Sequence, residues 1–188
     1  MENLVYAIIL LPLFGFVING LLGKHLPKMV VGALATLVVF ASFLISVNIF
    51  LGFTDHSAPI IVKAFEWFTI GGIQVNFGFQ IDQLSLMMMM IVTGIGSLIH
   101  LYSIGYMSHD KGFYKFFTYL NLFIFSMLLL VMGSNYLILF IGWEGVGLCS
   151  YLLIGFWYEN TEYGKAARKA FIMNRIGELG LLIGIFPL

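Results

Sequence analysis

One stretch of the sequence decides the fold. Residues 136–157 read YLILFIGWEGVGLCSYLLIGFW, an apolar run in which Glu144 is the only charged residue. A helix needs roughly 20 mostly apolar residues to cross a membrane, because each residue adds ~1.5 Å across a hydrocarbon layer of ~30 Å. This stretch therefore predicts a transmembrane helix with a carboxyl group close to its middle.

The composition of the whole chain also indicates a membrane protein. Its 188 residues are 61% hydrophobic and 10% charged, and the mean hydropathy is +1.01. Soluble domains are about half apolar and about one quarter charged, so a soluble fold would leave too much apolar surface in water. The net charge of zero gives no basic face for nucleic acid, and the single cysteine, Cys149, excludes an internal disulfide and a multi-thiolate metal site.

We therefore predict an all-α membrane protein in which residues 1–188 form a single membrane domain. Helices are required because an open sheet would leave backbone groups unpaired in lipid. The first apolar run is expected to remain as a span, since Met1-Glu2-Asn3 lacks the positive charge of a signal peptide. The six predicted spans are Leu4–Gly23, Met29–Phe53, Leu84–Met107, Phe113–Val131, Tyr136–Trp157 and Ala166–Leu188.

Residues 54–83, between the second and third predicted helices, follow a different pattern. Apolar and polar residues alternate from Ile73 to Asp82, after an apolar run at Phe65–Ile70 and a break at Gly71-Gly72. A period of two is typical of a β-strand. The pattern predicts a β-hairpin at the membrane surface.

Two shorter signals concern the ends of helices. Asp82 or Ser85 is expected to cap the third helix, because a side-chain oxygen there can accept a bond from an unpaired backbone N–H. Gly133-Ser134-Asn135 predicts a tight turn, which makes the fourth and fifth helices antiparallel neighbours.

Lysine and arginine residues outside the apolar runs predict the orientation, since they accumulate in loops on the inner side of a membrane. With the N-terminus external, the external connections hold only Lys63. The hairpin and the N-terminus are therefore predicted to be external. The basic residues assigned to the internal side are Lys24, Lys28, Lys111, Lys115, Lys165, Arg168 and Lys169.

Glu144 is the first candidate functional residue. A charge at the centre of a spanning helix costs about 3 kcal/mol on insertion scales, so such a residue normally faces a bundle interior or a water-filled path. Apolar surroundings favour its neutral form and a nearby cation favours its charged form, so the group can take up and release a proton. The alternative is a neutral acid that only bonds to a neighbouring helix. Gly142, Gly145 and Cys149 form a small-residue stripe that allows another helix to approach closely.

Three further ionisable residues lie in predicted spans. Arg175 and Glu178 are three residues apart, so they share a helix face and can pair. The pair either lowers the cost of insertion or exchanges partners and so changes the proton affinity of Glu144. His100, near the inner end of the third helix, is either a proton relay or a histidine bonded to a neighbouring side chain.

The sequence around Glu144 resembles a known family. Residues 142–156, GWEGVGLCSYLLIGF, are similar to a signature of the antiporter-like L subunit of NADH:quinone oxidoreductase, or respiratory complex I, whose mitochondrial equivalent is subunit 5. Related cation/proton antiporter subunits share part of this Trp-Glu environment. The resemblance covers essentially the whole chain and continues over FQIDQLS at 79–85, IHLYSIGYM at 99–107, FFTYLNLF at 116–123 and RIGE at 175–178.

This resemblance implies a role for each candidate residue. Glu144 corresponds to a fifth-helix glutamate that is central to proton translocation. Glu178 corresponds to a sixth-helix acid that is often aspartate, so its extra methylene is a departure. Arg175 corresponds to a basic neighbour of that acid, and His100 to a position of less certain role.

Three functions remain open from the sequence. The first is a proton-translocating subunit that couples quinone reduction to proton pumping in a bacterial or mitochondrial inner membrane. Its partners are then other membrane subunits of complex I, and NADH, flavin, iron–sulfur clusters and quinone are expected in other subunits, with no cofactor or metal in this chain. The second is a sodium/proton antiporter subunit of the same ancestry. The third is a membrane fragment that transports nothing.

The length of the chain is the main departure from the family. Members are several-fold longer, and the lysine that partners the residue equivalent to Glu144 lies on a helix after the sixth. We therefore expect residues 1–188 to be a truncated or partial chain.

Overall fold

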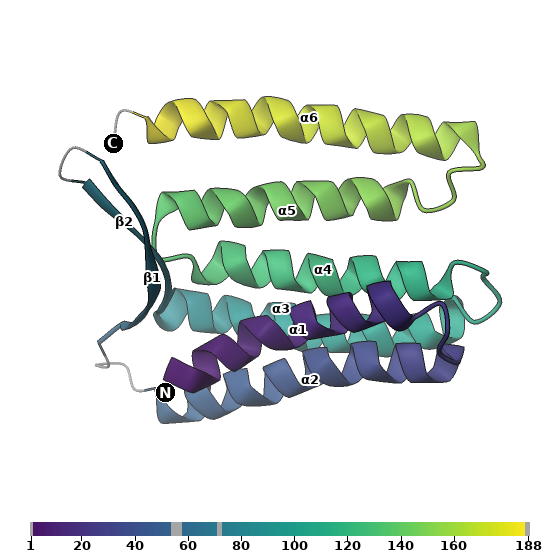
Figure 1. The fold of residues 1–188 in the computed structure, drawn as a ribbon, viewed down its shortest axis with the longest axis horizontal. Helices are drawn as coiled ribbons and strands as arrows, with labels where there is room; N and C mark the ends of the chain where they lie inside the picture. Colours follow the sequence, from purple (N-terminus) through teal and green to yellow (C-terminus); the bar gives the residue numbers. More distant parts are fainter. Residues whose placement is uncertain (1, 54–57, 71–72, 187–188) are drawn as a thin grey trace.

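The computed structural model describes residues 2–53, 58–70 and 73–186, and Figure 1 shows their arrangement. They form helices and one two-stranded antiparallel sheet, so the predicted helical membrane fold with a hairpin between the second and third helices is confirmed. The predicted Gly71-Gly72 turn lies outside the described residues, as does the end of the sixth predicted helix. The elements are α1 (Glu2–Leu22), α2 (Lys28–Gly52), β1 (Ile60–Ile70), β2 (Ile73–Ile81), α3 (Gln83–Tyr106), α4 (Phe113–Met132), α5 (Tyr136–Ile154) and α6 (Thr161–Ile185).

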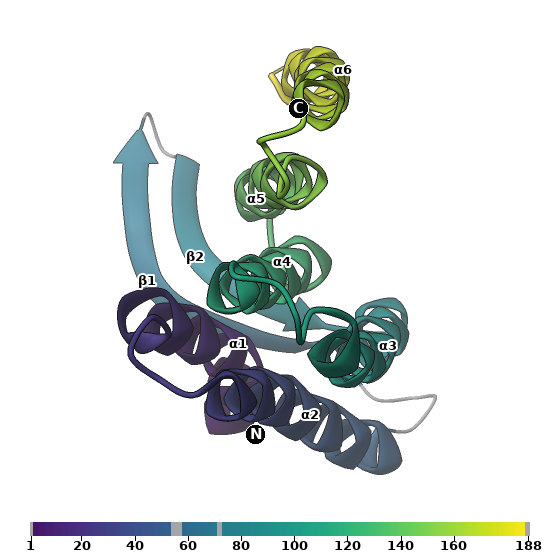
Figure 2. The ribbon, with the colours of Figure 1, turned by 90° about the vertical axis from the view of Figure 1, so that its right-hand side faces the viewer.

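The helices lie side by side, with the hairpin and the two ends of the chain at one end of the bundle (Figure 1). The connections α1–α2, α3–α4 and α5–α6 lie at the opposite end. Viewed along the helices, α1 to α4 form a cluster, and α5 and α6 extend from α4 in a row (Figure 2). This arrangement leaves α6 packed mainly on α5.

Within the residues that the structure describes, five of the six helices are long and apolar enough to cross a membrane. The exception is α6. With 25 residues it is long enough and it lies beside α5, but it carries more charged residues than the other helices. Only Ala167 and Glu178 of α6 are buried among the described residues. A carboxyl group is therefore part of the small buried surface of this helix. The charged residues in its last five turns are Arg168, Lys169, Arg175 and Glu178.

The first four helices begin and end within two residues of the predicted bounds, but the α5–α6 connection was predicted wrongly. Helix α5 ends at Ile154 rather than Trp157, and α6 begins at Thr161 rather than Ala166. The earlier start of α6 has a local cause. The Asn160 side chain accepts a hydrogen bond from the backbone N–H of Glu162, in the first turn of α6, at 3.0 Å and so caps the helix.

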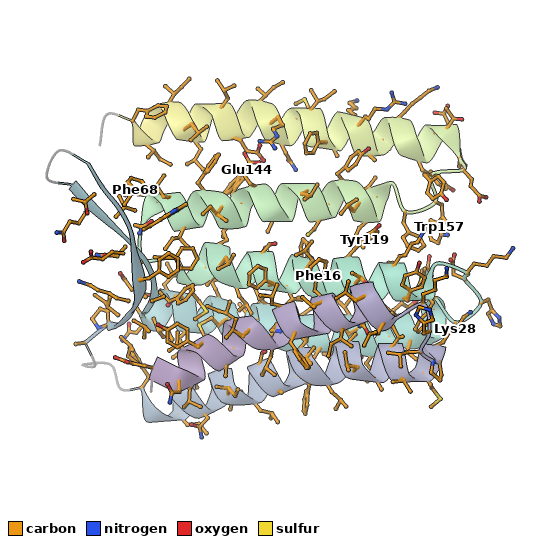
Figure 3. The ribbon with its side chains drawn as sticks, viewed as in Figure 1. Phe16, Lys28, Phe68, Tyr119, Glu144 and Trp157 are labelled. Carbon is orange, nitrogen blue, oxygen red and sulfur yellow. The ribbon has the colours of Figure 1, made fainter. Side chains whose placement is uncertain are left out.

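Trp157 belongs to the loop end of the bundle rather than to α5. Its indole Nε1–H donates to Asp110 in the α3–α4 loop at 2.8 Å, and this bond lowers the pKa of the Asp110 carboxyl. Lys28 donates to the carbonyl oxygens of Ser108 and Asp110 at 2.8 and 2.9 Å. Figure 3 places Lys28 and Trp157 at the end opposite the hairpin. These bonds tie the three loops of that end together.

The hairpin is joined to the bundle at its base. Phe79 and Ile81 of β2 are buried in the main apolar core, and Phe77 stacks on Phe65 of β1 with ring centroids 5.2 Å apart. Asp82 then begins α3 with a capping box, in which Ser85 N–H donates to the Asp82 carboxylate at 2.8 Å and Asp82 N–H donates to Ser85 Oγ at 2.7 Å. The predicted cap is confirmed, and the Ser85 N–H lowers the pKa of Asp82.

A proline in α1 explains one polar contact between helices. Pro12 has no N–H, so the carbonyl of Ile8 one turn earlier lacks its usual helical donor. The hydroxyl of Ser42 in α2 lies 3.0 Å from this carbonyl oxygen and donates to it. Such compensation is required where lipid offers no alternative donor.

Candidate functional site

Small residues hold α5 against α4, as the sequence predicts. A Cβ at Gly142 would lie 2.6 Å from Cα of Leu130, and one at Gly145 would lie 2.5 Å from the Ser126 hydroxyl. Since real Cβ atoms do not approach so closely, both positions need glycine at this helix spacing. Cys149 is buried on the same stripe. This packing fixes the rotation of α5 about its axis.

The same rotation directs Glu144 away from α4. Figure 3 shows its side chain in the space between α5 and α6, close to the middle of both helices. There the Arg175 guanidinium of α6 donates from Nη1 to Glu144 Oε1. The side chain of Glu144 is 22% exposed and that of Arg175 is 51% exposed in the described residues. The cation beside Glu144 is thus Arg175 of the neighbouring helix.

Glu178 completes a cluster of three charged groups. Its Oε2 lies 3.1 Å from the same Arg175 Nη1, which confirms the predicted pairing across one helical turn. Its side chain is only 4% exposed, and Oε2 has no hydrogen bond of acceptable geometry within the part of the chain that the structure describes. Gly147 leaves room for this carboxyl group, because a Cβ there would lie 3.0 Å from Glu178 Oε1.

The charge balance of the cluster defines what it can do. Two carboxylates face one guanidinium nitrogen, and the Arg175 cation also lies 5.2 Å from the centre of the Phe171 ring. A second negative charge in apolar surroundings is costly without a further cation or a proton. The arrangement can therefore hold one exchangeable proton on Glu144 or Glu178 while Arg175 pairs with the other carboxylate.

His100 lies in a different part of the bundle. It is fully buried between α3 and α4, with Nε2 3.0 Å from Asn121 Oδ1 and Nδ1 2.7 Å from the Gly96 carbonyl oxygen. Among the described residues, no hydrogen bond or ion pair connects it with Glu144, so the structure does not bring the four candidates together. Sequence reasoning missed Asn121, although an asparagine within an apolar helix was a visible signal.

A cavity of about 800 Å³ opens at the loop end of the bundle, between α4, α5 and α6. Polar and aromatic side chains line it, including Lys111, Lys115, Tyr119 and Tyr151. Tyr151 follows Glu144 by seven residues on α5, which is two turns on the same helix face and ~10 Å along the axis. The cavity thus extends from the loops toward the charged cluster.

Comparison with known families gives two matches. Residues 67–117 match the family described as the N-terminus of chain 5 of NADH-ubiquinone oxidoreductase (complex I). Residues 133–188 match the family of transmembrane regions of NADH:quinone oxidoreductase and Mrp antiporters. The second match contains the whole Glu144–Arg175–Glu178 cluster.

Individual relatives carry the name NADH-quinone oxidoreductase subunit L. The chain is 50% identical to the Campylobacter jejuni protein over 99% of its own length, and 46% identical to the Mycobacterium tuberculosis protein over 96%. It is 44% identical to the Rickettsia typhi protein over its full length. The chain spans only about 30% of the length of these relatives, as 30%, 29% and 29% of the three are covered.

Solved structures share the fold at lower identity. A chain of an archaeal respiratory membrane complex, the membrane-bound sulfane sulfur reductase, aligns with 98% of this chain and 36% of its own at a TM-score of 0.82 and 17% identity. A chain of the Mrp complex from Dietzia sp. DQ12-45-1b aligns with 95% of this chain and 18% of its own, at 0.77 and 23%. The sequence matches thus show that the chain resembles the N-terminal third of subunit L of NADH-quinone oxidoreductase, and the solved structures show that it shares the fold of these membrane subunits.

Proposed function

We propose that this chain is part of a proton-translocating membrane subunit of NADH:quinone oxidoreductase, in which quinone reduction elsewhere in the complex drives proton movement through the α5–α6 cluster. The single observation that carries the proposal is the sharing of Arg175 Nη1 by Glu144 and Glu178. Two acids and one cation in apolar surroundings form a group whose proton occupancy changes when the cation changes partner.

The exchange requires little movement. Arg175 contacts both carboxylates from one nitrogen, so a small rotation of its side chain favours one acid over the other. The acid that loses the cation gains affinity for a proton, and the acid that keeps the cation releases one. Glu144 is the more accessible of the two carboxylates and Glu178 the more buried. Glu144 therefore exchanges protons with water, and Glu178 sets the position of Arg175.

The cavity at the loop end supplies a route for those protons. It reaches Tyr151, two turns from Glu144, and its mouth is lined by charged groups of the α3–α4 loop and α4. Water in this cavity would bring protons to within two turns of Glu144 along α5. His100 has no place on this route, so we assign it at most an indirect part in translocation.

The proposal includes the setting of the chain. The lysine-rich connections face the inside of a bacterial or mitochondrial inner membrane, and the hairpin and N-terminus are external. Other membrane subunits of the complex are the partners. NADH, flavin, iron–sulfur clusters and quinone are bound by other subunits, so this chain contributes to an oxidoreductase without carrying a redox centre.

The test is Glu144→Gln in the full-length subunit within its native complex, reconstituted into vesicles. Proton uptake driven by NADH and quinone should fall sharply while the subunit still assembles in normal amount. Gln keeps the size and the hydrogen-bonding oxygen but cannot bind a proton or carry charge. Normal pumping by the assembled variant complex would overturn the proposal.

A sodium/proton antiporter subunit is the second candidate. Two observations favour it, namely the description of the family that matches residues 133–188 and the shared fold with a chain of an Mrp complex. The two functions differ in their driving reaction. Proton movement that requires a sodium gradient and is indifferent to NADH would favour the antiporter, whereas movement that requires NADH and quinone would exclude it.

A further inference from the structure

A second polar group lies inside the bundle, apart from the α5–α6 cluster. Asn19 of α1, His100 of α3 and Asn121 of α4 are all buried, with relative exposures of 0%. Asn19 Nδ2 donates to the Val31 carbonyl of α2 at 3.4 Å. His100 joins the Gly96 carbonyl of its own helix to Asn121, at 2.7 and 3.0 Å. These bonds reach across four helices, with one connection missing between Asn121 and Asn19.

The missing connection is bounded by two unpaired polar atoms. Asn19 Oδ1 and Asn121 Nδ2 have no hydrogen-bond partner among the residues that the structure describes. Asn121 Nδ2 faces α1 at Gly15, where an added Cβ would lie 2.6 Å from it. Asn19 follows Gly15 by four residues, so it lies one turn along the same face of α1.

The two atoms have complementary chemistry. The amide oxygen needs a donor and the amide nitrogen needs an acceptor, and a water molecule is both. Asn121 Nδ2 thus lies beside Gly15, and the backbone of Asn19 is ~6 Å farther along α1, a separation on the scale that one water spans with two hydrogen bonds of ~2.8 Å. Buried waters occupy such polar sites in proteins, and leaving these amide atoms unpaired in apolar surroundings is unfavourable. We infer that one water molecule binds between Asn19 and Asn121 and completes a hydrogen-bonded chain from α3 to α2.

The inferred water can form hydrogen bonds with Asn19 and Asn121 in both protonation states of His100. Nδ1 carries a proton, because it faces the Gly96 carbonyl. A charged ring also donates from Nε2 to Asn121 Oδ1, whereas a neutral ring accepts there from Asn121 Nδ2 with the amide turned over. When the ring is charged, the water accepts from Asn121 Nδ2 and donates to Asn19 Oδ1. When the ring is neutral, the water donates to the Oδ1 atoms of both Asn19 and Asn121. His100 can thus change state without leaving an amide atom of Asn121 unpaired.

The direct test is high-resolution electron cryomicroscopy of the intact membrane complex with its full-length subunit. A discrete solvent peak is expected within hydrogen-bond distance of both Asn19 and Asn121. The same measurement on Asn19→Leu should show the peak lost and Asn121 still beside His100. Direct bonding between the two asparagines, another side chain at this position, or a peak that persists in Asn19→Leu would each overturn the inference.

A double-mutant cycle tests the coupling in solution. Asn19→Leu and Asn121→Leu should each lower the thermal midpoint of the purified complex, and the double variant should lose less than the sum, because the water and both amides leave together. Ser46→Ala is the matched control, since its hydroxyl is fully buried but bonds within α2 to Ser42 O at 2.9 Å. Combined with Asn19→Leu, it should act additively. Additive losses from Asn19 and Asn121 would contradict the bridging water.

Discussion

Arg175 of α6 donates from one guanidinium nitrogen to Glu144 of α5, and the same nitrogen lies 3.1 Å from Glu178. Removing either carboxylate therefore leaves the cation with a partner, whereas removing the cation leaves two negative groups side by side. The three residues are functionally unequal for this reason, and substitutions should separate their contributions.

Glu178→Gln should impair proton pumping less than Glu144→Gln does. In the Glu178 variant, Arg175 and Glu144 remain paired, so the more exposed of the two carboxylates keeps its charge partner. The comparison uses NADH-driven acidification of vesicles, with electron transfer and assembly measured on the same samples. A loss in Glu178→Gln as large as that in Glu144→Gln would show that Glu178 is itself an obligatory proton carrier.

Arg175→Lys should retain much of the pumping that Arg175→Gln loses. Both carboxylate contacts use Nη1, so the arrangement depends on a single positive nitrogen rather than on the two-pronged geometry of guanidinium. Lysine supplies one such nitrogen, and glutamine supplies none. Equal loss in the two variants would show that the shape of the guanidinium or its contact with Phe171 is required, and not only its charge.

The sequence predicts most of this fold because lipid restricts the possibilities. Apolar length placed the helices, the period-two pattern placed the hairpin, and the position of Asp82 and Ser85 indicated that one of the two caps α3. The α5–α6 connection was predicted wrongly because apolar aromatic residues such as Trp157 extend past the end of α5. Hydropathy does not register that Asn160 caps the next helix.

The site could be predicted only in part, for a related reason. Pairing between Arg175 and Glu178 follows from their spacing on one helix, but the contact of Arg175 with Glu144 depends on how α5 and α6 pack. His100 was recognisable in the sequence as a titratable residue, but its partner was not, because its hydrogen bond to Asn121 joins residues 21 positions apart. Contacts between helices are not encoded in a local pattern, so the structure was needed to separate His100 from the cluster.

Gly142→Ala should destabilise the subunit by about 1–3 kcal/mol, the typical cost of overpacking. The new methyl group would meet the Leu130 backbone, which cannot move without shifting α4. Gly105→Ala is the control, because a Cβ there meets nothing within 4 Å, and alanine in an open helical position should stabilise by roughly 0.5–1 kcal/mol. Thermal unfolding of the purified complex measures both. Equal effects would contradict the close packing of α5 on α4.

Asp82→Ala should cost about 1 kcal/mol at neutral pH, because the α3 capping box is lost. Asp82→Asn should cost little, since asparagine caps as well as aspartate. The Ser85 N–H lowers the pKa of Asp82 below 3.8, so the carboxylate contributes fully above pH 3.8 and loses its contribution as the pH falls through the lowered pKa. The difference in thermal midpoint between wild type and Asp82→Ala should therefore be constant above pH 3.8 and become smaller as the pH falls below 3.8, where the charge on the cap is lost. A difference that stays constant below pH 3.8 would contradict this account.

Ser42→Ala should destabilise the bundle by about 1–3 kcal/mol, the cost of leaving a buried carbonyl unpaired. Ser42 is the donor to Ile8 O, which Pro12 leaves without a helical N–H. Ser46→Ala should cost less, although Ser46 is equally buried, because its hydroxyl bonds a carbonyl that already has a helical donor. Both are measured as thermal midpoints of the purified complex.

A second variant removes Pro12, the residue that leaves the Ile8 carbonyl without a helical donor. Pro12→Ala restores an N–H that can bond Ile8 O within α1, so Ser42→Ala should cost clearly less in the Pro12→Ala background than in the wild type. The difference between the two costs isolates the free energy of the Ser42–Ile8 bond from that of the lost hydroxyl. If Ser42→Ala costs the same in both backgrounds, the hydroxyl stabilises the bundle through its other neighbour, Val38 O at 3.1 Å, and the link between Pro12 and Ser42 is wrong.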